Sequence, residues 1–180
     1  LMQRDRDTDD IYISYSTPKT PSRTFIYNLK TKEKKLVKEQ IIPSGHNSND
    51  YIVERLECEG HDGRLIPITI TRKKTTKLDG NSNLLLYGYG SYGNSMSPSF
   101  SSTRLSLINR DIIWATAHIR GGMERGMKWW KEGKLLNKKN TFQDYISCAK
   151  FLIDKKYTSK KKIIGMGGSA GGLLMGAVVN

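Results

Sequence analysis

The stretch that decides the fold lies near the end of the chain, where one apolar run enters a cluster of glycines and a second apolar run follows. It reads Ile163-Ile164-Gly165-Met166-Gly167-Gly168-Ser169-Ala170-Gly171-Gly172-Leu173-Leu174-Met175-Gly176-Ala177-Val178-Val179. The first run favours a buried strand, and the second favours a helix. Between them, Gly167, Ser169 and Gly171 have the G-x-S-x-G spacing of a sharp strand-to-helix turn.

This spacing has a physical reason. A serine on so sharp a turn adopts a strained backbone, and side chains two residues to either side would collide. The turn lifts the hydroxyl of Ser169 clear of the sheet, and the N-terminus of the following helix supplies a backbone N–H for a developing oxyanion. Ser169 is therefore the candidate nucleophile, and the elbow consists of Gly167, Gly168 and Gly171. A phosphate-binding glycine turn is the weaker interpretation, because the Gly-Lys-Ser/Thr ending of a P-loop is absent.

Two earlier apolar runs, Leu84–Tyr87 and Ile112–Ala117, also end in glycine-rich loops with polar groups. Uninterrupted apolar strands are typical of a parallel sheet covered by helices. A helix is expected from Thr141 to Ile153, where apolar residues recur at i, i+3 and i+4. Ligands bind at the carboxyl edge of such a sheet, so the three loops are expected to form one site.

Short strands joined by polar turns dominate the first part of the chain, which favours sheet-on-sheet or propeller structure there. The expected strands are Ile11–Tyr15, Thr24–Leu29, Lys35–Val37, Tyr51–Cys58 and Leu65–Thr71. Asp62-Gly63 favours a tight hairpin turn between the last two. The turn-rich stretch Pro43–Asp50 is the predicted domain boundary.

Composition excludes several classes of protein. With 37% hydrophobic and 26% charged residues the chain is globular, not disordered. No apolar run reaches the roughly 18 residues of a membrane helix, so no membrane partner is expected. The net charge of +13 comes mostly from lysines. Many of them, such as Lys138-Lys139 and Lys160-Lys161-Lys162, flank predicted elements and are interpreted as solvated, so no nucleic-acid partner is expected.

The cysteines and histidines do not form a recognisable site. Cys58 and Cys148 lack metal-ligand spacing and are interpreted as reduced thiols of a cytoplasmic protein, without metal or cofactor. His46, His61 and His118 all precede Ser169, whereas hydrolases of this kind order the triad as serine, acid, histidine. None of the three is assigned as the base, and all are interpreted as structural or exposed.

Four motifs in order resemble the prolyl oligopeptidase family of serine peptidases, and within it the oligopeptidase B branch most. They are Leu84-Leu85-Leu86-Tyr87-Gly88-Tyr89-Gly90-Ser91-Tyr92-Gly93, Arg120-Gly121-Gly122 followed by Trp129 and Gly133, Asn140-Thr141-Phe142-Gln143-Asp144, and Gly167-Gly168-Ser169-Ala170-Gly171-Gly172. The resemblance is dense from about Tyr51 to Asn180 and weaker from Ile11 to Val37.

The resemblance implies an α/β fold class: a partial α/β-hydrolase fold, with a mostly parallel sheet and flanking helices, after the last strands of a β-propeller. Residues 1–42 are expected to be the terminal propeller blade. Residues 43–180 are expected to be the N-terminal part of the catalytic domain, truncated after the nucleophile elbow. The chain is thus expected to be a fragment of a longer enzyme.

The resemblance also implies a function: hydrolysis of short peptides after Arg or Lys by a Ser-Asp-His triad. Ser169 matches the nucleophile, and the Tyr89 hydroxyl and the Ala170 N–H match the oxyanion hole. Tyr92 matches an aromatic position near the primary specificity pocket. Relatives often carry acidic residues at the positions of Ser97 and Ser99, where they help hold a second basic residue of the substrate. Because both residues are neutral here, a preference for paired basic residues is in question.

Two alternatives remain open. The chain fits another α/β-hydrolase, such as an acylaminoacyl peptidase or esterase, or a non-catalytic product of a decayed or split gene. Only eleven residues follow Ser169, and the family's catalytic Asp and His come later. The polypeptide alone is therefore expected to be inactive, with the strand before Ser169 at an unpaired, aggregation-prone edge. The oligomeric state is left open.

Overall fold

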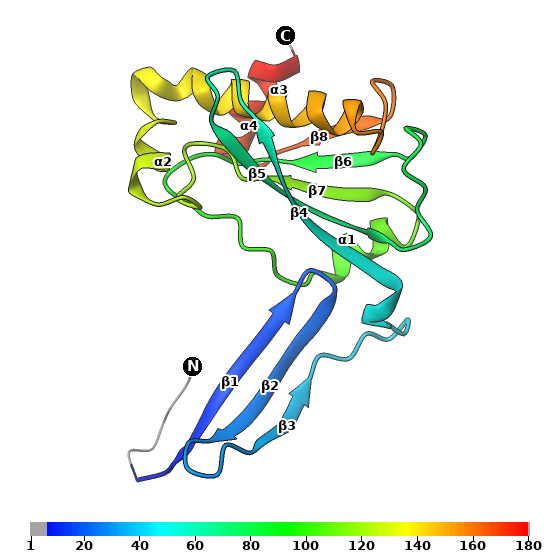
Figure 1. Cartoon of the computed structure of the whole chain (residues 1–180), viewed down its shortest axis with the longest axis vertical. Coiled ribbons are helices and arrows are strands. Elements are labelled where there is room, and N and C mark those ends of the chain that lie inside the picture. Colours follow the sequence, from blue (N-terminus) through cyan, green and yellow to red (C-terminus); the bar gives the residue numbers. More distant parts are fainter. Residues whose placement is uncertain (1–6, 180) are drawn as a thin grey trace.

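The computed structural model describes residues 7–179, which form two separate sheets joined by a connecting segment (Figure 1). Residues 1–6 of the first predicted domain and Asn180 of the second lie outside the described residues. The smaller sheet occupies one end of the molecule, and the larger sheet with its helices occupies the other.

The smaller sheet is an antiparallel meander in the order β1-β2-β3. Its strands are β1 (Asp10–Thr17), β2 (Thr20–Asn28) and β3 (Lys34–Glu39), which confirms the first three predicted strands. Ile11 lies opposite Tyr27, and Ile13 opposite Phe25, so apolar cross-strand pairs set the register. Tyr12 and Tyr15 are nevertheless half exposed, so this sheet has little core of its own.

The larger sheet has the order β4-β5-β7-β6-β8. Its strands are β4 (Tyr51–Glu59), β5 (Leu65–Lys73), β6 (Leu84–Tyr87), β7 (Ile113–Ala117) and β8 (Ile163–Met166). The expected mostly parallel sheet is wrong in part, because β4 and β5 pair antiparallel, and β5 also runs antiparallel to β7. The short turn at Asp62-Gly63 can join only antiparallel neighbours, since parallel strands need a long crossover.

The helices cover both faces of the larger sheet. They are η1 (Ser48–Asp50), α1 (Ser102–Ile108), α2 (Met127–Lys131), η2 (Leu135–Asn137), α3 (Lys138–Asp154) and α4 (Ala170–Val179). Helices α3 and α4 lie over one face, and α1 lies on the other (Figure 1). The two long helices were predicted. The sequence pattern missed α1 and α2, which have only seven and five residues and show no complete apolar period.

Successive side chains of the central strands point to opposite faces. Leu84 and Leu86 pack with the helix α3 residue Leu152, whereas Leu85 packs with Leu105 of α1. Strands β6 and β7 are thus buried on both faces, as predicted. Strand β8 is not, because it is the edge strand among the described residues, and Ile164 and Met166 are 48% and 47% exposed.

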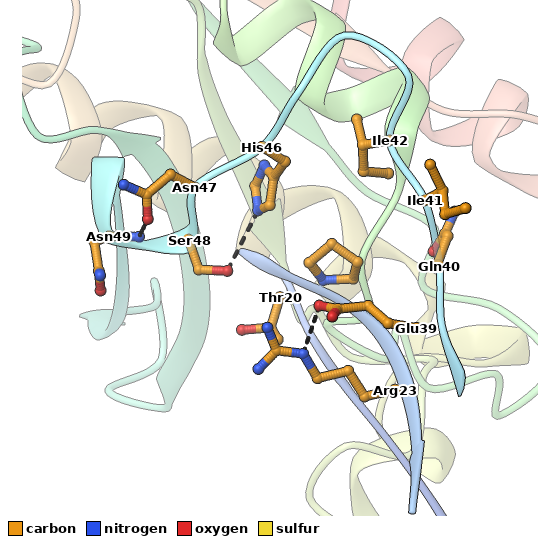
Figure 2. A pocket seen from close by; sticks show the side chains of 11 residues that line it. Thr20, Arg23, Glu39, Gln40, Ile41, Ile42, His46, Asn47, Ser48 and Asn49 are labelled. Carbon is orange, nitrogen blue, oxygen red and sulfur yellow. Dashed lines mark hydrogen bonds and ion pairs between the residues drawn. The ribbon is translucent and has the colours of Figure 1, made fainter. Parts of the chain in front are cut away.

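A polar cavity of about 540 Å³ lies where the smaller sheet meets the connecting segment (Figure 2). Arg23 and Glu39 form an ion pair at 2.7 Å on one side of it. On the other side, the His46 Nε2 atom is 2.7 Å from the carbonyl oxygen of Lys19, and the ring stacks on Tyr51. His46 therefore links the β1–β2 turn to the larger sheet, in agreement with its interpretation as structural.

A buried ion pair fixes the loop that follows β7. Arg120 and Asp144 are 1% and 0% exposed. The Arg120 Nε and Nη2 atoms donate to the two carboxylate oxygens of Asp144 at 2.9 and 2.5 Å, and Nη1 donates to Asp62 at 2.5 Å. The loop after β7, helix α3 and the β4–β5 turn are thereby held together by one guanidinium.

We predict that Asp144→Asn destabilises the fold by about 3–5 kcal/mol, because it leaves the buried Arg120 charge without its bidentate partner. The free energy of unfolding, measured in denaturant by tryptophan fluorescence, tests this. Asp154→Asn makes the same change at the exposed end of α3 and should cost less than about 0.5 kcal/mol. Equal losses in the two variants would contradict the prediction.

Candidate active site

The turn between β8 and α4 has the geometry expected of a nucleophile elbow. Ser169 has a φ of 54°, in the left-handed region that non-glycine residues rarely adopt. A Cβ on Gly167 would lie 2.5 Å from the carbonyl oxygen of Gly171. A Cβ on Gly171 would lie 3.0 Å from the Gly88 carbonyl oxygen. Glycine at both positions is therefore a steric requirement, as the motif predicted.

The loop after β6 lies directly beside this elbow. The Gly88 N–H donates to the Met166 carbonyl oxygen at 3.0 Å, and the Tyr89 ring lies 3.6 Å from the place of a Cβ on Gly171. The structure thus brings Tyr89 next to the start of α4, where the backbone N–H of Ala170 begins the helix. The N–H groups of the first helical turn have no acceptor within the helix and can bind an anion.

Lys138 also fixes the loop after β6. Its Nζ donates to the Gly90 carbonyl oxygen at 2.6 Å and to Ser91 Oγ at 2.9 Å. Burial lowers the pKa of Lys138 below its ordinary value. The interpretation of this lysine as solvated is wrong, and nothing in the sequence distinguishes it from the exposed Lys139.

A cavity of about 430 Å³ opens next to the elbow. It is lined by Tyr92, Trp130, Lys134, Ala170 and Leu173, among others. Tyr92 has a φ of 56° and is 77% exposed, and the Lys134 Nζ lies 3.6 Å from the centre of the Trp130 ring. The structure therefore brings Tyr92 and Ala170 together. Trp130 and Lys134 were not predicted, because they come from α2 and the turn after it, which only the fold carries to the elbow.

The structure places Ser97 and Ser99 away from this cavity. Ser97 lines a different cavity, together with His118 and Glu124. The Ser99 N–H donates to the Ser97 carbonyl oxygen at 2.9 Å, and the Ser99 carbonyl oxygen accepts from Arg104 at 2.8 Å. The two serines thus form part of the turn that leads into α1.

No histidine is positioned as a base for Ser169 in the described residues. His118 is 1% exposed, with its Nε2 atom 2.8 Å from Thr69 Oγ1 and its Nδ1 atom 3.5 Å from Glu124. His46 lies at the junction of the sheets, and His61 is exposed in the β4–β5 turn. The triad order used to exclude all three agrees with these positions.

The remaining candidate residues, the two cysteines, have a structural place in the interior. Cys58 and Cys148 are free, buried thiols with their sulfur atoms 3.5 Å apart. Within residues 7–179, no group of three or more His, Cys, Asp or Glu side chains could hold a metal ion. A search of the same part of the chain found no helix long and apolar enough to span a membrane.

Comparison with known proteins gives consistent matches. Residues 98–180 match the model of the Prolyl oligopeptidase family. The dipeptidyl aminopeptidase BI of Pseudoxanthomonas mexicana is 45% identical over 96% of this chain and 24% of its own length. Protease 2 of Moraxella lacunata is 41% identical over 100% of this chain and 26% of its own length.

Among solved structures, oligopeptidase B from Leishmania major matches with a TM-score of 0.88 and 38% identity, over 97% of this chain and 24% of that one. The chain therefore spans about a quarter of the length of the relatives it matches.

We predict that Gly167→Ala destabilises the chain by about 1–3 kcal/mol, because the added methyl group would collide with the Gly171 carbonyl oxygen. Gly168→Ala is the matched control, since a Cβ there meets nothing within 4 Å, and its effect should stay within about 0.5 kcal/mol. Urea unfolding of both variants measures the difference. If Gly168→Ala proves as damaging as Gly167→Ala, the steric account of the elbow is wrong.

Proposed function

Because residues 98–180 belong to the prolyl oligopeptidase family and the whole chain is related to its members, we propose that the chain carries the nucleophile of a serine peptidase. The observation that carries this proposal is the backbone of Ser169. A positive φ at a serine, enforced by two close approaches at Gly167 and Gly171, is a strained arrangement. Such strain persists where the surrounding structure holds it in place, and it clusters at functional sites.

In the proposed reaction, the hydroxyl oxygen of Ser169 attacks the peptide carbonyl carbon. The Ala170 N–H and the Tyr89 hydroxyl donate to the oxyanion that forms. The position of Tyr89 beside the start of α4 supports this pairing. Donors aimed at a developing charge, in a site that excludes water, lower the barrier most, because they need no reorganisation during the reaction.

We assign the base and its carboxylate partner to residues beyond these 180. All three histidines of the chain precede Ser169, and the His118 Nε2 atom is engaged by Thr69 Oγ1. Without a base the serine hydroxyl is a weak nucleophile. The exposed Ile164 and Met166 of β8 support the related proposal that further strands cover this edge in the whole enzyme.

The two sheets suggest a division of the chain into functional parts. We propose that residues up to 42 form the last blade of a β-propeller and that residues from 43 form the first part of an α/β-hydrolase domain. The smaller sheet supports this because it is a three-stranded antiparallel meander without a full core. A blade of this kind is stabilised by its neighbours in the propeller.

We propose short peptides as substrates, with cleavage after Arg or Lys. The likeness to Protease 2 and to oligopeptidase B supports this class of reaction. Tyr92, in the cavity next to Ala170, is the proposed aromatic contact for the residue before the cleaved bond. The two free thiols, Cys58 and Cys148, favour a reducing, cytoplasmic location.

A second candidate function is release of dipeptides from the amino terminus. It is favoured by the 45% identity to a protein named dipeptidyl aminopeptidase BI. Chromogenic dipeptides and tripeptides that end in Arg, with the amino group free or acetylated, separate the two reactions. A strict requirement for the free amino group and two residues would replace the oligopeptidase proposal with this one.

The protein as its gene encodes it should hydrolyse an Arg-p-nitroanilide peptide, and Ser169→Ala should abolish turnover. We expect Tyr89→Phe to lower kcat by about 100-fold to 1,000-fold with little change in KM, because its hydroxyl serves only the oxyanion. Tyr92→Phe, which removes a hydroxyl from the neighbouring cavity, is the matched control for kcat. A Tyr89→Phe enzyme with wild-type kcat would refute the assignment of Tyr89.

The purified 180-residue polypeptide should show no turnover of the same peptide, because it contains no base for Ser169. The measurement is release of p-nitroaniline at high protein concentration, compared with the Ser169→Ala variant. Turnover that disappears on Ser169→Ala would contradict the proposal that the base lies outside this chain.

A further inference from the structure

Two cysteines from distant parts of the chain meet in the core between the larger sheet and α3. Cys58 lies near the end of β4, and Cys148 lies within α3. They are 90 positions apart in the sequence, yet their sulfur atoms are 3.5 Å apart. Both are free thiols, and they are 1% and 0% exposed. The fold therefore places two reduced sulfurs in direct contact.

The contact is close enough for the sulfurs to bond without a change of fold. Bonded sulfurs are about 2.05 Å apart, so the two atoms need to approach by only about 1.5 Å. The side chains around them, such as Ile66 and Leu152, are apolar. Within residues 7–179 no third ligand completes a metal site with the pair. The chemistry open to the two thiols is therefore reaction with each other.

The two thiols are not chemically equivalent. The hydrogen bond with Cys148 lowers the pKa of Cys58, whereas burial raises the pKa of Cys148 well above its ordinary value. The thiolate therefore forms on Cys58, and Cys148 keeps its proton and donates to it. Because the thiolate is the nucleophile in thiol chemistry, Cys58 is the attacking sulfur of the pair.

Strand β4 provides a route by which a small oxidant reaches Cys58. Among the described strands of the larger sheet, β4 is at one edge, since the order is β4-β5-β7-β6-β8. The flanking Glu57 and Glu59 are exposed, so the sulfur lies one layer below the surface. Segments at the margin of a fold open locally at a lower free energy than the whole protein unfolds. Such an opening of β4 admits a molecule the size of hydrogen peroxide.

We propose that Cys58 and Cys148 form a reversible disulfide on exposure to hydrogen peroxide. The Cys58 thiolate attacks one peroxide oxygen, the O–O bond breaks, and the products are a sulfenic acid on Cys58 and, after protonation, water. The Cys148 sulfur then attacks the Cys58 sulfur. The S–S bond forms, the S–O bond breaks, and the departing hydroxide takes the Cys148 proton to give a second water. The two sulfurs are oxidised as the peroxide is reduced, and a dithiol restores both thiols by exchange.

The new bond joins the same two parts of the chain that Arg120 joins. Asp62 follows Cys58 in the β4–β5 turn, Asp144 lies one helical turn before Cys148, and both carboxylates accept from Arg120. A covalent link between β4 and α3 therefore reinforces the cluster that positions the loop after β7. A cross-link between positions so far apart also restricts the unfolded chain, so the oxidised protein resists unfolding more than the reduced one.

The test uses the protein as its gene encodes it, treated with hydrogen peroxide under native conditions. The remaining thiols are then blocked with N-ethylmaleimide in denaturant, and the protein is digested without reductant. We expect mass spectrometry to find the peptides of Cys58 and Cys148 joined, two hydrogens lighter than the separate thiol peptides and released by dithiothreitol. Recovery of both cysteines as maleimide adducts, or linkage of either one to a different cysteine, would overturn the proposal.

Two single variants test the order of the steps. In Cys148→Ser, Cys58 has no second thiol to react with, so its sulfenic acid should persist and be captured by dimedone. In Cys58→Ser, the buried Cys148 should capture about tenfold less dimedone, because its thiol stays protonated. Equal capture in the two variants would overturn the assignment of Cys58 as the attacking sulfur. The linked peptide of the wild-type protein decides the proposal even where a serine variant does not fold.

Amide hydrogen exchange measures the effect of the disulfide on the fold. Oxidation should slow exchange in α3 by about tenfold or more, because opening of the helix then has to carry β4 with it. Helix α1, on the other face of the sheet, is the internal control and should not change, nor should α3 in peroxide-treated Cys58→Ser. If the linked peptide is present and α3 exchange is unchanged, the stabilising role is wrong. Neither measurement requires turnover, so both are independent of the function proposed for Ser169.

Discussion

Arg120 is a buried cation whose partners come from distant parts of the chain, Asp144 in α3 and Asp62 in the β4–β5 turn. A charge in such a place is tolerated only when every donor is matched, and here the fork of the guanidinium meets two carboxylates. The backbone takes part as well, because the Arg120 N–H donates to Asp144 and its carbonyl oxygen accepts from Thr141. These side-chain and backbone contacts of Arg120 fix the position of the whole loop after β7.

The cavity beside the elbow and the cavity lined by Glu124 both depend on the position of the loop after β7. Gly121 fits beneath the loop after β6 so closely that a Cβ there would lie 2.0 Å from the Gly90 carbonyl oxygen. On one side of the loop, Trp130 lines the cavity beside Ala170. On the other side, Glu124 lines the second cavity. One buried ion pair therefore positions walls of both cavities, and a shift of this loop would move both.

The strands and the two long helices could be predicted from the sequence, because each rests on a local pattern. Alternation, apolar runs and the i, i+3, i+4 spacing in α3 depend on neighbours along the chain. The Asp62-Gly63 turn predicted the antiparallel pairing of β4 with β5. Nothing in the sequence predicted that β5 would lie beside β7. Helices α1 and α2 were missed because they are too short to show a period. The exposure of β8 was recognisable only once the strand order was known.

The sequence by itself determined the elbow around Ser169, since glycine spacing and a positive φ are constraints within a few residues. It also determined the likeness to one family, through motifs in a fixed order. The tertiary structure alone decided which side chains meet. Lys138 became a half-buried clamp while Lys139 stayed in solvent, and among the described residues the Oε2 atom of Glu124 was left without a hydrogen-bond partner. Burial and pairing depend on residues far apart in the chain, and no local pattern encodes them.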